Sequence, residues 1–147
     1  MSWLLDRPAE RAEVLELRPE LAEAHAALLE AVWAGPVPAS TLELCRLRMA
    51  QLLDARRALT ERSPQAAGLD EACVAGLNRW ASDASFDDAE RACLAFTELF
   101  VVDHHAISDA QAAAVVAALG EPGFVALTTA LAVWENQHRL DIALGVS

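Results

Sequence analysis

No stretch of this sequence alternates polar and apolar residues over the length of a β-strand. Residues that favour helices dominate, with 32 Ala and 22 Leu against two Ile and eleven Val. The chain is also 54% hydrophobic, which is too apolar for a disordered protein. These features predict an all-α fold.

Helix start and stop signals divide the chain into six or seven expected helices. Pro19 can occupy the first position of a helix, and Gly35 can end it. Ser108 and Gln111 have the spacing of a capping box. The expected helices run from Pro19 to Gly35, Ser40 to Arg62, Asp70 to Trp80, Phe86 to Val102, Ser108 to Gly120 and Pro122 to Leu144, with a seventh from Pro8 to Leu17.

The length of 147 residues fits one domain spanning residues 1–147, and the chain has no fixed-period repeat. The N-terminus has no cationic segment before its apolar residues, which argues against a signal peptide. The longest weakly polar run, from Gly123 to Trp134, is too short for a bilayer, which needs about 20 residues. We therefore expect a cytoplasmic protein with no membrane partner.

The net charge argues against nucleic-acid binding, and the cysteine count argues against a disulfide-stabilised fold. The 22 acidic and 11 basic residues give a net charge of −11, and such a surface repels phosphate backbones. Nucleic acid is therefore not an expected partner. The three cysteines are an odd number, which argues against a disulfide framework.

One segment resembles a known family. From Leu42 to Leu52 the chain reads LELCRLRMAQL, which is similar to the core helix of the carboxymuconolactone decarboxylase and alkylhydroperoxidase D-like (AhpD-like) superfamily. The family pattern is Glu-Leu-x-x-Leu-Arg-x-Ala-Gln-Leu, followed by Cys-x-x-Cys and then by His. Three later segments match in order, AAGLDE at 66–71, DAERACLAF at 88–96 and NQHRLDIALG at 136–145.

This resemblance covers residues 20–147 and implies a single AhpD-like helical domain. It also implies a homo-oligomer, commonly a trimer or a hexamer, with a dimer as the other option. The redox members of the family use the Glu, both Cys and the His for peroxide chemistry.

This chain keeps the glutamate of that set as Glu43. The two cysteine positions hold Ala55 and Ala58, and the histidine position holds Arg62. A methyl group can neither attack a peroxide nor form a disulfide. We therefore expect no peroxidase cycle of the family's type, and no cofactor.

Three functions stay open at this stage. The first is a small-ligand-binding or non-catalytic oligomeric protein, with a small acidic molecule as ligand. The second is a cysteine-independent lyase acting on a lactone or keto acid, with Glu43 and Arg62 in the site. The third is residual thiol chemistry at Cys45, whose neighbours Arg46 and Arg48 could lower its pKa.

Glu43 also has a local interpretation. Ser40 and Glu43 have capping-box spacing, so the carboxylate could bond the amide of Ser40 at the start of the helix. The family pattern favours a site role and the local motif favours a cap.

Five of the eleven arginines are concentrated within seventeen residues, at positions 46, 48, 56, 57 and 62. They could form an acid-binding pocket, with Arg62 as the best candidate because it can hold a carboxylate through a bidentate fork. The alternative is that three of them face a helix C-terminus while Arg46 and Arg48 pair with neighbouring carboxylates. Arg62, Arg48 and His138 are the expected ligand-contacting residues.

The remaining candidates have structural explanations. Cys45, Cys73 and Cys93 lie within expected helices, where free cysteines behave as small buried hydrophobes. Glu135 and His138 could share a metal on one helix face, but a di-iron bundle needs a second such motif, so we expect no metal site. We expect Trp33, Trp80 and Trp134 to anchor the core or a subunit interface.

Overall fold

The computed structural model describes residues 4–146, so part of the N-terminal segment considered for a signal peptide lies outside the described residues. The described part contains seven α-helices, three short 3-10 helices and no strand, as the composition predicted. The α-helices are α1 (Arg11–Leu15), α2 (Pro19–Trp33), α3 (Ala39–Leu52), α4 (Arg56–Thr60), α5 (Glu71–Gly76), α6 (Asp88–Val102) and α7 (Asp109–Leu144).

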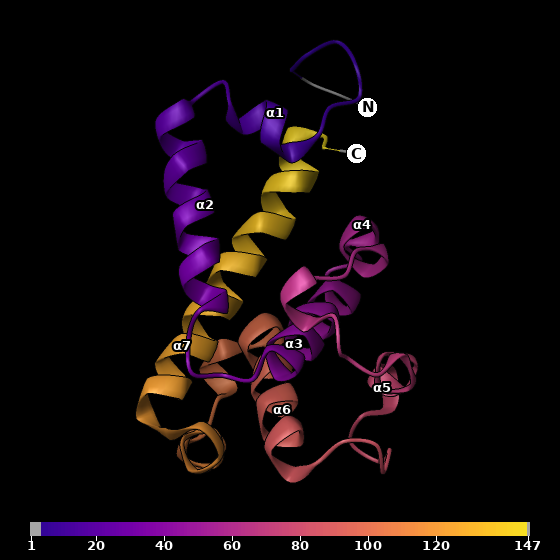
Figure 1. Ribbon diagram of the computed structural model, residues 1–147. Coiled ribbons are helices and arrows are strands. Elements are labelled where there is room, and N and C mark those ends of the chain that lie inside the picture. The colour runs from indigo at the N-terminus through magenta and orange to yellow at the C-terminus, as the bar shows by residue number, and fades with distance from the viewer. Residues whose placement is uncertain (1–3, 147) are drawn as a thin grey trace.

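Helix α3 lies at the centre of the fold and packs against both α6 and α7 (Figure 1). Its buried residues include Leu42, Leu44, Leu47 and Met49, which belong to the main hydrophobic core. A helix buried on most of its surface is expected to be apolar all round rather than amphipathic. The charged Glu43 and Arg46 on this buried helix are therefore exceptional.

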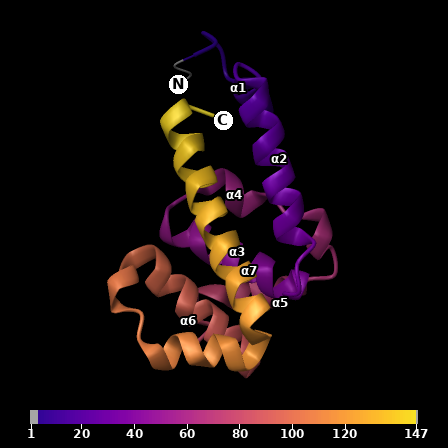
Figure 2. The same cartoon turned by 90° about the vertical axis from the view of Figure 1, so that its left-hand side faces the viewer.

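Helix α2 runs antiparallel to the C-terminal half of α7, and Figures 1 and 2 show the two extending away from the rest of the fold. The indole rings of Trp33 and Trp134 join them, with ring centroids 5.5 Å apart. Helix α1 crosses their far end, where Arg11 forms an ion pair with Asp141.

Helix α7 is divided at Gly120, where the backbone has φ 73° and ψ 169°. The predicted stop at Gly120 and restart at Pro122 are therefore confirmed in position. By length and composition alone α7 is the one helix in the described residues that could cross a membrane. One such helix is weak evidence for a membrane span, because the core helix of a soluble protein meets the same criterion; in α7, 28% of the most apolar window is buried.

Replacing Gly120 by alanine is expected to lower the free energy of unfolding by about 1–3 kcal/mol, because this backbone region is essentially restricted to glycine. Urea denaturation measures the loss. Gly68→Ala is the matched control, since no atom lies within 4 Å of its added Cβ and its φ is not positive. That control should leave stability unchanged or slightly higher, and an equal loss in both variants would refute the backbone explanation.

The predicted long helix from Ser40 to Arg62 is wrong. Helix α3 ends at Leu52, and Asp54 has a left-handed φ of 50° before α4 begins at Arg56. Asp is one of the few residues other than Gly that tolerate this conformation. The break turns the chain, so the segment with Ala55 and Ala58 folds back beside α3.

The sequence predicts N-caps at Ser108 for α7 and at Ser85, just before Phe86, for α6, and the two predictions had different outcomes. Ser108 and Gln111 do form the capping box that begins α7. Ser85 does not cap α6, because Asp87 is the N-cap and forms a capping box with Glu90. Ser85 has Asp88 three positions on, whereas Asp87 has Glu90, and a capping box needs the longer glutamate or glutamine side chain at that place.

Candidate functional site

Glu43 and Arg46 form a buried ion pair on α3. The Glu43 side chain is fully buried, and the exposure of Arg46 is only 7%. The Arg46 Nε and one of its terminal nitrogens donate to the two carboxylate oxygens of Glu43 at 2.8 and 2.7 Å. This is the bidentate geometry in which guanidinium and carboxylate groups bind most strongly.

The pair also fixes the segment that follows α3. The backbone N–H and the hydroxyl of Ser63 donate to Glu43 at 3.0 and 2.7 Å. Arg46 donates to the carbonyl oxygens of Ala58 and Glu61 at 3.2 and 3.0 Å. Two charged side chains on one helix thus bind four groups of the α4 segment and the loop after it.

The predicted capping box at Ser40 is wrong. Pro38 is the N-cap of α3, so Ser40 lies within the first turn, and Glu43 bonds Arg46 and Ser63 instead. The prediction that Arg46 pairs with a neighbouring carboxylate is confirmed. The separation of three residues between Glu43 and Arg46 on one helix face was a signal for this pair, whereas nothing in the sequence indicated Ser63.

The chemistry available to Glu43 is limited by these bonds. Burial by itself would raise the pKa of Glu43, but the Arg46 guanidinium and the two bonds from Ser63 outweigh burial and lower it. The carboxylate therefore stays ionised and accepts four hydrogen bonds. A saturated, acidic carboxylate is a poor general base.

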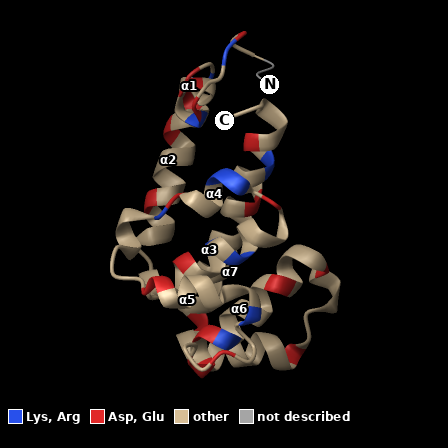
Figure 3. Cartoon of the chain, turned by 90° about the vertical axis from the view of Figure 1, so that its right-hand side faces the viewer, with Lys and Arg blue, Asp and Glu red and all other residues tan. Residues whose placement is uncertain are grey.

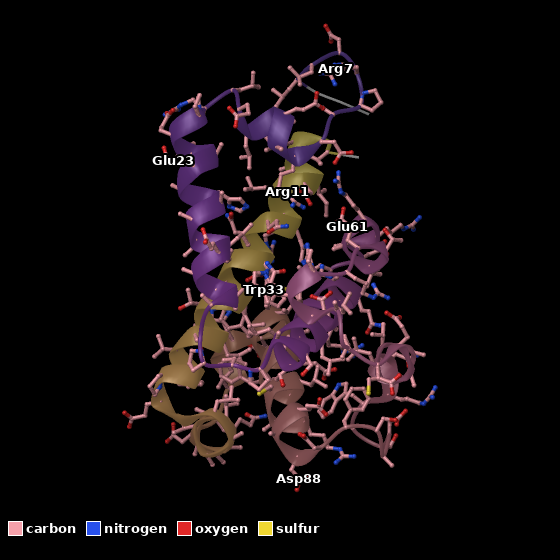
Figure 4. The ribbon with its side chains drawn as sticks, in the orientation of Figure 1. Arg7, Arg11, Glu23, Trp33, Glu61 and Asp88 are labelled. Atoms are coloured by element: carbon pink, nitrogen blue, oxygen red, sulfur yellow. The ribbon has the colours of Figure 1, made fainter. Side chains whose placement is uncertain are left out.

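An open cavity of about 680 Å³ lies between α2, α7 and the loop after α4. We call it the main cavity. Its lining includes Leu29, Trp33, Arg46, Arg62, Ser63 and Trp134. Trp33 and Glu61, which border it from α2 and from the end of α4, are labelled in Figure 4. The cavity thus combines an aromatic wall with a cationic one.

Arg62 borders the main cavity, but its guanidinium already has protein partners. Its Nε and one terminal nitrogen contact the Glu71 carboxylate at 3.1 and 3.3 Å, and the other terminal nitrogen bonds the carbonyls of Leu59 and Glu61. The Glu71 side chain is 69% exposed. Exposed pairs of this kind contribute about 0–1 kcal/mol, so a ligand could replace Glu71 at little cost.

Ala55 and Ala58 line a second cavity of about 220 Å³, which we call the small cavity. His138 and Asp141 border it from α7, and Asp54 and Arg57 from the α4 side. Only 2% of the His138 surface is exposed, and neither ring nitrogen has a hydrogen-bond partner. Burial and the nearby Arg46 lower the pKa of His138 from 6.5 to about 4, so the ring is neutral near pH 7.

Arg48 is not brought to either cavity. It points from α3 to α6 and bonds Glu98 at 2.7 Å, and the Trp80 indole N–H donates to the same carboxylate at 2.8 Å. The second predicted arginine–carboxylate pair is therefore confirmed. Figure 3 shows the basic residues of α4 as a separate blue segment.

The cysteines lie as predicted for core residues, with Cys45 and Cys93 buried and Cys73 partly buried. The idea that Arg46 and Arg48 lower the pKa of Cys45 is wrong, because burial raises that pKa. Both arginines instead face carboxylates. A buried, protonated thiol is unreactive.

No protein-family model matches this chain, and no curated protein matches it. Its fold does match solved structures. A cysteine-to-alanine variant of the debrominase Bmp8, in complex with 2,3,4-tribromopyrrole, has a TM-score of 0.82 and 16% identity, covering 92% of this chain and 74% of that one.

A protein of unknown function from Agrobacterium tumefaciens, for which an antioxidant defence role as AhpD is suggested, has a TM-score of 0.79 and 17% identity, covering 95% of this chain and 97% of that one. At these identities the likeness concerns the fold. The chain therefore has the AhpD-like helical fold that its resemblance to the carboxymuconolactone decarboxylase and AhpD-like superfamily implied.

Proposed function

We propose that this protein binds a small carboxylic acid with a ring-shaped apolar body in the main cavity, and that it is not a thiol peroxidase. The observation that carries the proposal is the lining of this cavity, where two adjoining indole rings face the same space as two guanidinium groups. Ligand sites commonly combine a mostly apolar wall with a few polar groups.

The aromatic wall would hold the ring of the ligand. Trp33, which is partly buried, would make this contact, because Trp134 is almost fully buried and offers little surface; the planes of the two rings are inclined by 50°. Aromatic pairs favour such tilted arrangements, and a third ring could extend this one. That the Bmp8 structure holds a tribromopyrrole supports a ring-shaped ligand in this fold.

The cationic wall would hold the carboxylate. Arg62 can exchange the exposed Glu71 for a ligand, while four of the five N–H groups of Arg46 are used by the protein and one is left. Glu30 and Glu61 also border the cavity, but Glu61 is paired with Arg57. A ligand acid would therefore bind best against Arg62.

The loss of the thiols supports a binding role over peroxide chemistry. Alanine occupies both cysteine positions of the family pattern, and the cysteines that remain lie elsewhere in the fold. The lyase alternative would require Glu43 to release one of its four hydrogen bonds before it could accept a proton. We favour binding because it needs no such rearrangement.

The expected partners follow from the same proposal. The homo-oligomer implied by the family resemblance stays a prediction, as does the cytoplasmic location. Leu21 and Leu28 on α2 and Leu17 just before it are exposed, and such a surface is typical of one that another subunit covers.

Isothermal titration with benzoate tests the proposed function. We expect benzoate to bind the native chain and to raise its melting temperature, and Arg62→Gln to weaken binding at least tenfold through loss of a charge-assisted bond worth about 1.5–3 kcal/mol. The matched control is Arg56→Gln, since the Arg56 side chain is 87% exposed and does not border the main cavity.

Benzamide, which lacks the charge, should bind more weakly than benzoate. If benzoate and its saturated analogue cyclohexanecarboxylate both fail to stabilise the protein, or if the two arginine variants behave alike, the acid-binding proposal is wrong.

A further inference from the structure

The hydroxyl group of Ser63 has a fixed direction in this fold. Its oxygen lies 2.7 Å from the Oε2 atom of Glu43. The other three hydrogen bonds to this carboxylate come from N–H groups, two of them on Arg46 and one on the Ser63 backbone. An ionised carboxylate that receives N–H donors on both oxygens can only accept. The hydrogen between Ser63 and Glu43 therefore belongs to the serine hydroxyl.

This hydrogen is not easily turned elsewhere. A hydroxyl donating to a carboxylate forms a charge-assisted bond, which is stronger than a bond between neutral groups. The Glu43 side chain is fully buried, so a hydroxyl that turned away would leave a buried charge short of one partner. Ser63 thus stays committed as a donor to Glu43.

Ser63 is consequently an acceptor toward the main cavity. It lines that cavity and is only partly buried. A serine hydroxyl has one hydrogen and two lone pairs, and here the hydrogen is already used. What the side chain can offer to a ligand is a lone pair, so the group that bonds it must be a donor.

Arg62 and Ser63 therefore have opposite requirements, although they are neighbours in the sequence and both line the main cavity. The guanidinium of Arg62 carries only N–H donors and suits a carboxylate. The Ser63 oxygen suits an O–H or N–H group. One acid that carries both kinds of group would satisfy both residues.

We propose that Ser63 selects the ligand of the main cavity, and that this ligand is an aromatic acid with a hydroxyl or amino substituent. Its carboxylate binds Arg62, its ring lies against Trp33, and its substituent donates to the Ser63 oxygen. The inference rests on the proposed function, which it narrows from ring-shaped acids in general to those with a hydrogen-bond donor. Sites built to bond a hydroxyl group discriminate against the analogue that lacks it.

Isothermal titration of the full-length protein with the three isomeric hydroxybenzoates tests this inference, with benzoate and the matching methoxybenzoates for comparison. We expect at least one hydroxybenzoate to bind about two- to tenfold more tightly than benzoate, which is the range expected for one net hydrogen bond. Its methoxy analogue keeps the oxygen but has no hydrogen to donate, so it should show no such gain.

Two variants at Ser63 keep a group that can bond Glu43. In Ser63→Cys the thiol can still donate, but sulfur is a weak acceptor, so the gain from the hydroxyl should be lost. Ser63→Thr should keep the gain, because the backbone is extended at this position, with φ −72° and ψ 128°, and suits a β-branched residue. Ser82→Ala is the matched control, since the exposed Ser82 does not line the main cavity.

The two proposals can fail separately. If benzoate binds but no hydroxybenzoate binds more tightly, the inference about Ser63 is wrong and the acid-binding proposal stands. The inference is also wrong if the gain persists in Ser63→Cys. Glu30 borders the same cavity and can accept a bond, so a gain lost in Glu30→Gln instead would assign the donor to that carboxylate. If neither benzoate nor any hydroxybenzoate binds, the acid-binding proposal itself has failed.

Discussion

Replacing Arg46 by methionine is expected to lower the free energy of unfolding by about 3–5 kcal/mol, because it leaves the Glu43 carboxylate buried without its counter-charge. Glu43 would keep only the two bonds from Ser63. The variant would also lose the hydrogen bonds that Arg46 donates to the Ala58 and Glu61 carbonyls. The α4 segment should therefore loosen together with the core of α3.

Urea denaturation at pH 7 measures this loss, with Arg56→Met as the matched control. Arg56 faces Asp54 across 3.6 Å at the exposed surface, where an ion pair is worth at most about 1 kcal/mol. The double variant Glu43→Leu, Arg46→Met removes both charges and should recover part of the stability. A loss below about 1 kcal/mol for Arg46→Met would show that the buried pair does not hold the segment in place.

The helix content of this fold could be predicted because it depends on local preferences. Gly120 and Pro122 interrupt α7 for reasons that each residue carries with it, since one favours a left-handed backbone and the other cannot continue a helix. The Ser108 capping box likewise needs only residues within one turn. Such signals are visible without any knowledge of the packing.

The end of α3 could not be predicted in the same way. Neither Leu53 nor Asp54 is a strong helix breaker, and the flanking alanines and arginines favour a helix. The left-handed turn at Asp54 is stable because contacts distant in sequence hold the segment after it. One such contact joins Arg46 to the carbonyl of Glu61, fifteen residues away.

The same reason explains the error at Glu43. A capping box is read from four residues, but the partner that this carboxylate selects, Ser63, is twenty residues away. The family resemblance indicated that Glu43 belongs to the functional site, and the structure shows that its side chain is fully buried. The two cavities could not be predicted at all, because the main cavity lies between α2, α7 and the loop after α4, and the small cavity between the α4 segment and α7.

Lowering the pH from 6.5 to 4 is expected to remove about 3 kcal/mol of folding stability through His138 alone. Its pKa is lowered to about 4 in the folded chain, against 6.5 when unfolded, so the unfolded state binds the proton first as the pH falls. The contribution is fully present above pH 6.5, and it is lost between pH 6.5 and 4. Burial is the main cause, with Arg46 and Arg11 opposing the charge and Asp141 and Glu61 favouring it.

Urea denaturation across this pH range, for the native chain and for His138→Phe, isolates the effect. The pKa of His25 is also lowered by burial, so His25 contributes in the same direction in both proteins and cancels in the difference. Glu43 cancels too, and its lowered pKa makes its contribution fall only at more acidic pH. We expect the native curve to fall more steeply than the variant curve between pH 6.5 and 4. Parallel curves, or a nuclear magnetic resonance titration of His138 with a midpoint near 6.5, would contradict the assignment of a neutral, unpaired imidazole to the small cavity.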